Sequence, residues 1–397
     1  MHEPAHYPGR IRTDTTNPFA HHTMRVRVPA ILRGVLERND GYEPRVVRAV
    51  EELAAALESD ARLPPLDGET PGAGDVRRAL GERGGETWLG TDWFFAETYA
   101  YRQLVERVGF WDTLRDPFAP NKREEYASEQ HAAAFEGALA GSLARDERLA
   151  QLFLGGVFGN RIDLSFAASR AHGLDAAESD LLVDERERAV RCFFDGTGPL
   201  HLIADNAGTE LTLDLVLADF VLSELAVPVV LHLKEHPTFV SDATTDDVRS
   251  FLGLAGGALE VPRSEATRRC VARLAAAVTR GDLTLEAHPY WNGPASLWEL
   301  PAALASELAR ARLVVLKGDA NYRRAVGDAV WPAETPFADV AAYFPAPLLA
   351  LRTLKSDPIV GLAPGRAAAL DHEDATWRVN GKRGVASFGA GARGVRR

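Results

Sequence analysis

The chain has 397 residues, with 45 Lys and Arg against 56 Asp and Glu, and therefore a formal net charge of −11 at pH 7. This length, with 46% hydrophobic and 25% charged residues, is typical of a folded protein of two or three domains and excludes disordered and fibrous classes. An acidic surface repels phosphate backbones, so we expect no nucleic-acid partner. Any phosphorylated ligand would need a cationic pocket of its own.

The two cysteines, Cys192 and Cys270, lie far apart and have no partner at the spacing of a metal site or a disulfide framework. No stretch approaches the roughly 18–20 apolar residues that a membrane helix needs. The first residues carry charge and proline where a signal peptide has an apolar core. We therefore expect a cytoplasmic protein with no membrane partner.

The first half of the chain has helical periodicity. Between about residues 26 and 182, apolar residues recur three or four positions apart, as in Val47, Val50, Leu53 and Leu57. Proline and glycine interrupt this pattern at residues 63–74 and 116–120. The sequence predicts several helices joined by loops, and we assign residues 1–195 to a mainly helical domain.

The pattern changes at about residue 200, where short apolar runs begin to alternate with amphipathic segments. Strands are predicted at residues 200–204, 228–233, 283–286, 312–316 and 348–352, and helices at 209–223, 244–256, 264–280 and 297–310. This alternation predicts that residues 196–397 form a three-layer α/β/α, Rossmann-like domain with a mainly parallel sheet and helices on both faces. Residues 384–388 are expected to add an edge strand.

Polar residues directly follow the first predicted strand. Asp205 and Asn206 arrive together, Gly208 permits a tight turn, and Glu210 falls in the first turn of the next helix. Because ligands of doubly wound sheets bind beyond the carboxyl ends of the strands, this position favours a functional role. The alternative is that Asp205 or Asn206 only caps the helix.

A second carboxylate, Asp242, follows the second predicted strand. Thr244 and Asp247 have the spacing of a capping box, which leaves Asp242 free for another role. With Asp205 and Asn206 it gives three hard oxygen donors on neighbouring strand ends, a ligand type that suits Mg²⁺ or Mn²⁺ rather than Zn²⁺. The alternative is a surface loop carboxylate.

Two further strand ends carry cations. The strand at 312–316 continues into Lys317, Gly318, Asp319 and Asn321, where the lysine offers a point charge for phosphate and the glycine permits close backbone approach. The alternative is that the aspartate and the asparagine are turn residues.

The last of these strand ends carries Arg352 and Lys355. Such lysines are often only solvent-exposed, but here two lysines and three oxygen ligands fall on strand ends of one sheet. His236 and His288 also lie near strand ends and are candidates for auxiliary bases.

These motifs resemble the damage-control phosphatase family, and the RTxK motif near the C-terminus resembles its subfamily III, which includes the acidic-residue-methyltransferase-like proteins. The motifs are Asp205-Asn206-Ala-Gly208-x-Glu210, Val240-Ser-Asp242-x-Thr244, Lys317-Gly-Asp-x-Asn321-Tyr-Arg323 and Arg352-Thr353-Leu354-Lys355. Residues 93–102 and 159–165 resemble signatures of the family's helical domain. The resemblance covers about residues 24–388.

The resemblance implies a metal-dependent phosphatase that acts on sugar phosphates or related, damaged metabolites, with a metal-activated water attacking the phosphoryl group. Asp205, Asn206 and Asp242 would be the catalytic metal ligands, with Mn²⁺ as the first choice and Mg²⁺, Co²⁺ or Ni²⁺ as alternatives. The residues implied for substrate binding are Lys317, Gly318, Asp319, Asn321, Lys355, Glu210 and Arg352.

Other interpretations stay open at this point. Asp205 could itself be the nucleophile. Glu210 matches a position associated in the family with S-adenosylmethionine, so the alternative enzyme is a protein carboxyl methyltransferase acting on glutamate, and a non-catalytic metabolite-binding protein would have the same sequence features. Asn160 and Asp163 are expected either to approach the cleft or to pack between helices. The sequence predicts no oligomeric state.

Overall fold

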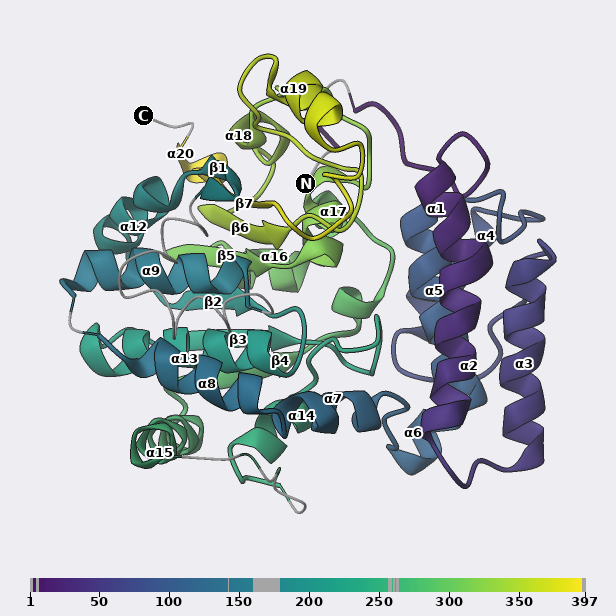
Figure 1. Ribbon diagram of the computed structural model, residues 1–397, viewed down its shortest axis with the longest axis horizontal. Helices are drawn as coiled ribbons and strands as arrows, with labels where there is room; N and C mark the ends of the chain where they lie inside the picture. Colours follow the sequence, from purple (N-terminus) through teal and green to yellow (C-terminus); the bar gives the residue numbers. More distant parts are fainter. Residues whose placement is uncertain are drawn as a thin grey trace.

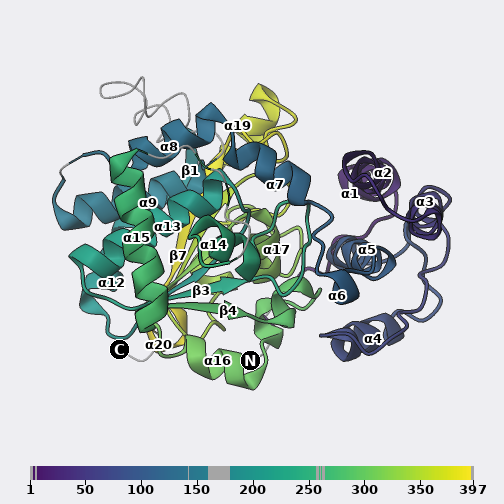
Figure 2. The same cartoon turned by 90° about the horizontal axis from the view of Figure 1, so that it is seen from below.

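The fold is given by a computed structural model that describes residues 3–4, 7–141, 143–159, 179–255, 259, 261 and 264–394. Figure 1 shows a bundle of N-terminal helices standing beside a larger part built around a sheet, and Figure 2 shows the same separation from below. No helix in the described ranges combines the length and the apolar character needed to cross a bilayer.

The N-terminal bundle has its own apolar core. Its elements are α1 (Pro18–His22), the π-helix η1 (Thr23–Arg27), α2 (Val28–Arg38), α3 (Pro44–Glu58), α4 (Ala73–Gly81), α5 (Trp93–Arg107) and α6 (Phe110–Thr113). Helix α5 is buried over most of its length because it lies between the other helices and the sheet-containing part. The signature at residues 93–102 therefore forms the inner wall of the bundle.

The sheet has seven strands in the order β1-β7-β6-β5-β2-β3-β4. The strands are β1 (Leu181–Asp184), β2 (Leu200–Ile203), β3 (Val229–Leu233), β4 (Leu283–Ala287), β5 (Leu313–Lys317), β6 (Leu348–Thr353) and β7 (Gly384–Gly389). All neighbours are parallel except β6 and β7. The carboxyl ends of β2, β3, β5 and β6 therefore meet at one edge of the sheet.

Helices cover both faces of the sheet, as the sequence predicts. One face carries α8 (Glu129–Leu139), α9 (Arg145–Val157), α12 (Arg186–Asp195), α13 (Thr209–Glu224) and α15 (Glu265–Arg280). The other carries α16 (Ala302–Leu308), α17 (Asp319–Val326), α18 (Phe337–Val340) and α19 (Arg366–Glu373). The shorter elements are α7 (Ala119–Tyr126), α14 (Thr245–Phe251), η2 (Pro289–Asn292), η3 (Leu297–Glu299) and α20 (Gly391–Gly394).

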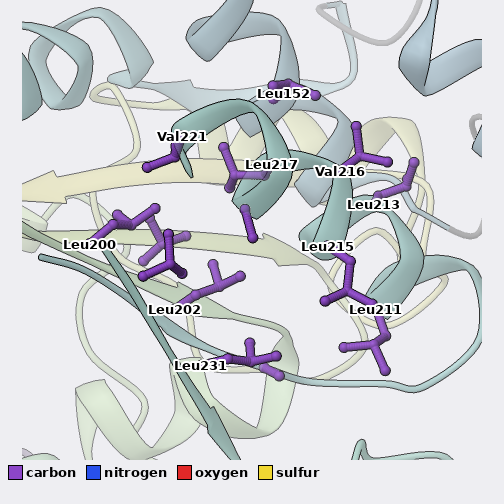
Figure 3. Packing of buried hydrophobic residues seen from close by; sticks show 14 of the residues in the cluster. Leu152, Leu200, Leu202, Leu211, Leu213, Leu215, Val216, Leu217, Val221 and Leu231 are labelled. Atoms are coloured by element: carbon purple, nitrogen blue, oxygen red, sulfur yellow. The ribbon is translucent and has the colours of Figure 1, made fainter. Parts of the chain in front are cut away.

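The α13 face of the sheet holds the largest apolar cluster (Figure 3). Leu200, Leu202 and Leu231 of the strands point toward Leu217 and Val221 of α13, and all five side chains are buried. Truncating a leucine in such a core to alanine costs about 2–5 kcal/mol of folding free energy. This packing fixes β2 and β3 relative to α13, whose first turn lies beyond the carboxyl end of β2.

The predicted strands are confirmed, and three details differ from expectation. Strand β7 is not at the edge, because it lies between β6 and β1, and β1 itself falls in a segment expected to be helical. The helix predicted at 297–310 is interrupted at Pro301, which separates η3 from α16. The domain boundary after residue 195 stays a prediction, although α8, α9, α12 and β1 all precede it and pack on the sheet.

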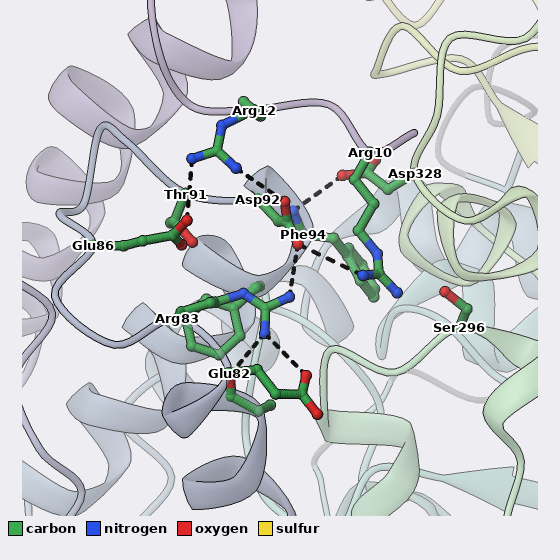
Figure 4. Close-up of polar contacts among 12 residues, drawn as sticks. Arg10, Arg12, Glu82, Arg83, Glu86, Thr91, Asp92, Phe94, Ser296 and Asp328 are labelled. Atoms are coloured by element: carbon green, nitrogen blue, oxygen red, sulfur yellow. Dashed lines mark hydrogen bonds and ion pairs between the residues drawn. The ribbon is translucent and has the colours of Figure 1, made fainter. Parts of the chain in front are cut away.

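Arginine and aspartate side chains tie the bundle to the sheet-containing part (Figure 4). Asp92, which precedes α5, pairs with Arg83 at 2.6 Å and lies within 3.7 Å of Arg10. The backbone N–H of Phe94 donates to Asp328, which follows α17, at 3.0 Å. The start of α5 is thus anchored to the loop that follows α17.

Candidate functional site at the carboxyl edge of the sheet

The structure brings the three predicted oxygen ligands together. Asp205, 7% exposed, follows β2, and its Oδ2 accepts a hydrogen bond from Asn206 Nδ2 at 3.0 Å. Asn206 forms an antiparallel backbone bridge with Asp242, and the N–H of Ala243 donates to the carbonyl of Asp205 at 2.7 Å. The loop after β3 is therefore bound along the loop after β2, with both carboxylates at the same edge.

A glutamate from outside the sheet caps α13, so neither Asp205 nor Asn206 does. The N–H of Thr209 donates to Glu125 Oε1 of α7 at 2.8 Å. The capping box of Thr244 and Asp247 is present at the start of α14. Asp205 and Asn206, for which helix capping was the alternative interpretation, are thus available for another role.

Gly318 allows β5 to approach Asp205. It has a φ of +84°, and a Cβ at this position would lie 1.9 Å from Asp205 Oδ2. A side chain here would displace the carboxylate as well as strain the backbone. Asn321 ties the same two strands together, because its Nδ2 donates to the carbonyls of Ala204 and Lys317 at 3.1 and 2.9 Å.

Lys317 is buried and paired with a residue that the sequence did not single out. Its Nζ donates to Asp214 Oδ1 of α13 at 2.7 Å. Burial raises the pKa of Asp214 to about 6, although Lys317 opposes that rise. Burial also acts against the charge of Lys317, but Asp214 and Glu210 outweigh it and raise the lysine pKa.

Arg352 and Asp319 form a closed support for the loop that carries Lys355. Arg352 Nε donates to Asp319 Oδ1 at 2.7 Å, and its Nη2 donates to the carbonyl of Ser356 at 2.7 Å. Its Nη1 donates to the carbonyl of Pro358. Asp319 Oδ1 also accepts from the N–H of Lys355 at 3.2 Å. The guanidinium thus already binds protein groups, whereas the side chain of Lys355 is exposed.

Lys234 is a member of this edge that sequence reasoning missed. It directly follows β3, is 2% exposed, and its Nζ lies 3.2 Å from Asp242 Oδ2 and 3.0 Å from the carbonyl of Trp291. Burial lowers the pKa of Lys234, although Asp242 opposes the change. Its place immediately after a predicted strand was the available signal. Glu125 offered no such signal, because only the tertiary position of α7 brings it here.

The carboxylates of this edge are held together against their own repulsion. Burial, with Asp242 and Glu210 nearby, raises the pKa of Asp205 well above its ordinary value. Burial also raises the pKa of Asp242, although Lys234 works against that rise. Desolvation acts against the charge of Lys355, but Glu210 and Asp205 raise its pKa. A bound cation would keep both aspartates ionised.

The remaining predicted residues lie at different distances from this edge. Glu210 is in the first turn of α13, and a Cβ on Gly159 would lie 2.8 Å from its Cγ. Asn160 and Asp163 lie outside the described residues. His236 is buried, its ring nitrogen lies 3.0 Å from the carbonyl of Pro237, and burial lowers its pKa to about 3.

A cavity of about 940 Å³ opens beside Lys234, between the bundle and the loop after β3. Its lining includes the basic residues Arg38, Arg115, Lys122, Arg123 and Lys234. Lys122 is buried between Asp116 and Asp247, at 2.8 and 2.7 Å. The cavity gives the carboxyl edge an approach of mixed charge from the side of β3, because its lining also includes the acidic residues Asp40, Asp116, Glu235, Asp246 and Asp247.

Residues 23–370 match the model of the damage-control phosphatase ARMT1-like domain. The chain is 29% identical to damage-control phosphatase ARMT1 of Danio rerio, over 93% of this chain and 94% of the relative. It is 29% identical to the protein of the same name from Rattus norvegicus, over 97% and 99%, and 25% identical to that of Homo sapiens, over 96% and 98%.

A solved structure shares the fold. The crystal structure of a DUF89 family protein from Pyrococcus horikoshii superposes with a TM-score of 0.52 at 12% identity, covering 94% of this chain and 98% of that one. At this identity the likeness concerns the arrangement of helices and strands alone.

Proposed function

Because this chain belongs to the damage-control phosphatase ARMT1-like family, we propose that it hydrolyses phosphate monoesters, with sugar phosphates or related damaged metabolites as substrates and a divalent metal ion as cofactor. The observation that carries the proposal is the meeting of Asp205, Asn206 and Asp242 at one edge of the sheet, with Lys355 exposed on a neighbouring strand end. The relatives' names supply the reaction class.

The donor set fits a hard divalent ion. Two buried carboxylates and one amide would hold it. Burial raises the pKa of both carboxylates, and Asp242 and Glu210 add to the rise at Asp205, so a bound cation would favour their ionised forms. When bound, such an ion supplies Lewis acidity toward the phosphoryl group and toward water. Mn²⁺ is our first choice, since oxygen ligands with open positions suit it.

The chain's own cations would bind and orient the phosphate. Lys355 has its charge reinforced by Glu210 and Asp205, although burial opposes it, and it is free to approach a phosphoryl oxygen. Lys234 and Lys317 are buried beside Asp242 and Asp214, where they limit repulsion as negative charge accumulates. Asp319 and Arg352 act by placing the backbone of Lys355.

A panel of sugar phosphates tests the proposal. Chelator-treated protein should release no phosphate, and added Mn²⁺, Co²⁺, Ni²⁺ or Mg²⁺ should restore release from at least one ester. Turnover that persists after complete chelation would contradict the metal requirement. Calorimetry with S-adenosylmethionine tests the rival methyltransferase: tight binding without phosphate release would reverse the assignment.

A further inference from the structure

A second group of potential metal ligands lies on the opposite face of the sheet from α13. His201 of β2, His232 of β3 and Glu307 of α16 are, among the described residues, a group whose ligand atoms all lie within 4.8 Å of one another. Both histidines are 1% exposed. The proposed phosphatase reaction uses none of the three.

One ring nitrogen of His201 points toward one ring nitrogen of His232. His201 Nδ1 lies 2.8 Å from His232 Nε2 and 3.9 Å from Glu307 Oε1. The rings are nearly stacked, with centroids 5.1 Å apart, and Trp291 packs edge-on against His232 at 5.7 Å. The other nitrogen of His232, Nδ1, is buried and has no hydrogen-bond partner in the described part of the chain. A hydrogen bond between these two nitrogens, together with packing, therefore holds both imidazoles in place beside one carboxylate.

The spacing suits one tetrahedral ion. Zn–N bonds are about 2.0–2.1 Å long, which puts two nitrogen ligands of one tetrahedral ion about 3.3 Å apart. The nitrogens need to separate by only a few tenths of an ångström, and Glu307, which is 35% exposed, can move toward them. Imidazole with one carboxylate favours Zn²⁺ and related transition ions over Mg²⁺.

A further carboxylate lies next to this group. Glu286 of β4 is in register with His232, and neighbouring residues of parallel strands project from the same face. Glu286 is exposed at the edge of the sheet, which gives the group an entry path from solvent. Burial lowers the pKa of His201 to about 4, so this imidazole is a neutral donor at neutral pH.

We propose that His201, His232 and Glu307 bind one divalent transition-metal ion of the Zn²⁺ class, with water or Glu286 in the fourth position. The site is separate from the oxygen ligands at the carboxyl edge. The two sites are connected through Trp291. Its ring packs against His232, and its carbonyl accepts a hydrogen bond from Lys234. The bound ion crosslinks β2, β3 and α16 and stabilises the strand that carries Lys234.

Binding of Zn²⁺ and Co²⁺ to the full chain tests this assignment in an Asp205→Asn background, which weakens the proposed oxygen site. After the protein is stripped with chelator, reloaded with Zn²⁺ and dialysed, one equivalent of Zn²⁺ should remain bound, and Co²⁺ loaded in the same way should give the intense visible absorption of a tetrahedral nitrogen site. Adding Glu307→Gln should weaken the affinity at least about tenfold. Because Glu307 is partly exposed, this change spares the core.

The matched control is His372→Ala, an exposed histidine on α19, which should leave stoichiometry and spectrum unchanged. His201→Asn should abolish the Co²⁺ spectrum, with circular dichroism verifying that the variant is folded. Absence of tight Zn²⁺ binding in the Asp205→Asn protein would overturn the assignment. Equal binding with Glu307→Gln and with His372→Ala would do so as well.

Discussion

Asp205 and Asp319 follow neighbouring strands of one sheet, yet their surroundings differ in kind. Asp319 accepts hydrogen bonds from Arg352, Ser356 and the backbone of Lys355, and Arg352 and Arg323 hold its pKa below the ordinary value although burial opposes them. For Asp205, burial and neighbouring carboxylates raise the pKa.

This difference in surroundings indicates a structural role for Asp319 and a binding role for Asp205. The Asp319 group is closed, because Arg352 has 0% side-chain exposure, its charge is paired and its ring partner Tyr322 lies 4.4 Å away. The Asp205 group gathers like charges that folding alone does not favour. We therefore expect similar residues at equivalent positions to serve stability at Asp319 and ligand binding at Asp205.

The largest expected effect comes from Asp205→Asn. The change keeps the shape of the side chain and replaces a charged carboxylate ligand by a neutral amide, which is a weaker ligand, so turnover of a phosphate ester should fall at least about 10³-fold. The thermal unfolding midpoint should stay the same or rise, because repulsion with Asp242 is removed. Steady-state kinetics and calorimetric unfolding measure the two quantities. A variant that loses stability but keeps activity would show that Asp205, like Asp319, supports the structure.

Asp319→Asn should lower stability strongly and turnover only slightly. Leaving Arg352 buried without its partner costs about 3–5 kcal/mol of unfolding free energy. Turnover by the folded fraction should fall less than about tenfold, since Asp319 acts through the backbone of Lys355. Urea denaturation gives the stability change. If turnover instead fell as far as in Asp205→Asn, with stability retained, Asp319 would belong to the reacting group.

The contributions of Asp214 and Asp319 to stability should depend on pH with opposite signs. Asp214 has a folded pKa of about 6, so the native state binds more protons than the unfolded state between about pH 4 and 6. Asp214 therefore contributes up to about 3 kcal/mol to the free energy of unfolding at low pH, and this contribution is lost as pH rises through the folded pKa. Asp319, with a lowered folded pKa, contributes above the unfolded pKa and loses that contribution on acidification.

Comparing wild type with Asp214→Asn isolates this contribution. The stability of wild type relative to the variant should decrease from pH 4 to pH 7 in urea denaturation experiments. A difference that is constant, or that grows with pH, would show that Lys317 and Asp214 form an ordinary structural ion pair.

The smallest effect on stability is expected for Lys355→Met. The side chain is exposed and donates no hydrogen bond to the described residues, so stability should change by less than about 0.5 kcal/mol. Turnover should fall about 10- to 100-fold through loss of one positive charge beside the phosphate. Kinetics with Lys355→Arg as the conservative comparison measure this effect. Unchanged kinetics in Lys355→Met would remove Lys355 from the proposed site.

The sequence predicts this sheet well and its polar network only in part. Short apolar runs identified six strands, because burial on both faces leaves a continuous signal, whereas β1 is short and only half-buried. Asp205, Asn206 and Asp242 were predicted to meet because parallel strands share an edge. The pairing of Lys317 with Asp214, and of Arg352 with Asp319, depends on helix packing and on side-chain orientation, which spacing does not encode.

Manganese binding tests the central claim most directly. Electron paramagnetic resonance of free Mn²⁺, titrated with chelator-treated protein, should show one bound ion per chain in wild type. It should show no bound ion in Asp205→Asn. Asp319→Asn should still bind one ion, provided that its far-ultraviolet circular dichroism matches that of wild type. Equal Mn²⁺ binding by wild type and Asp205→Asn would contradict the claim that Asp205 and Asp242 hold a cation at this edge.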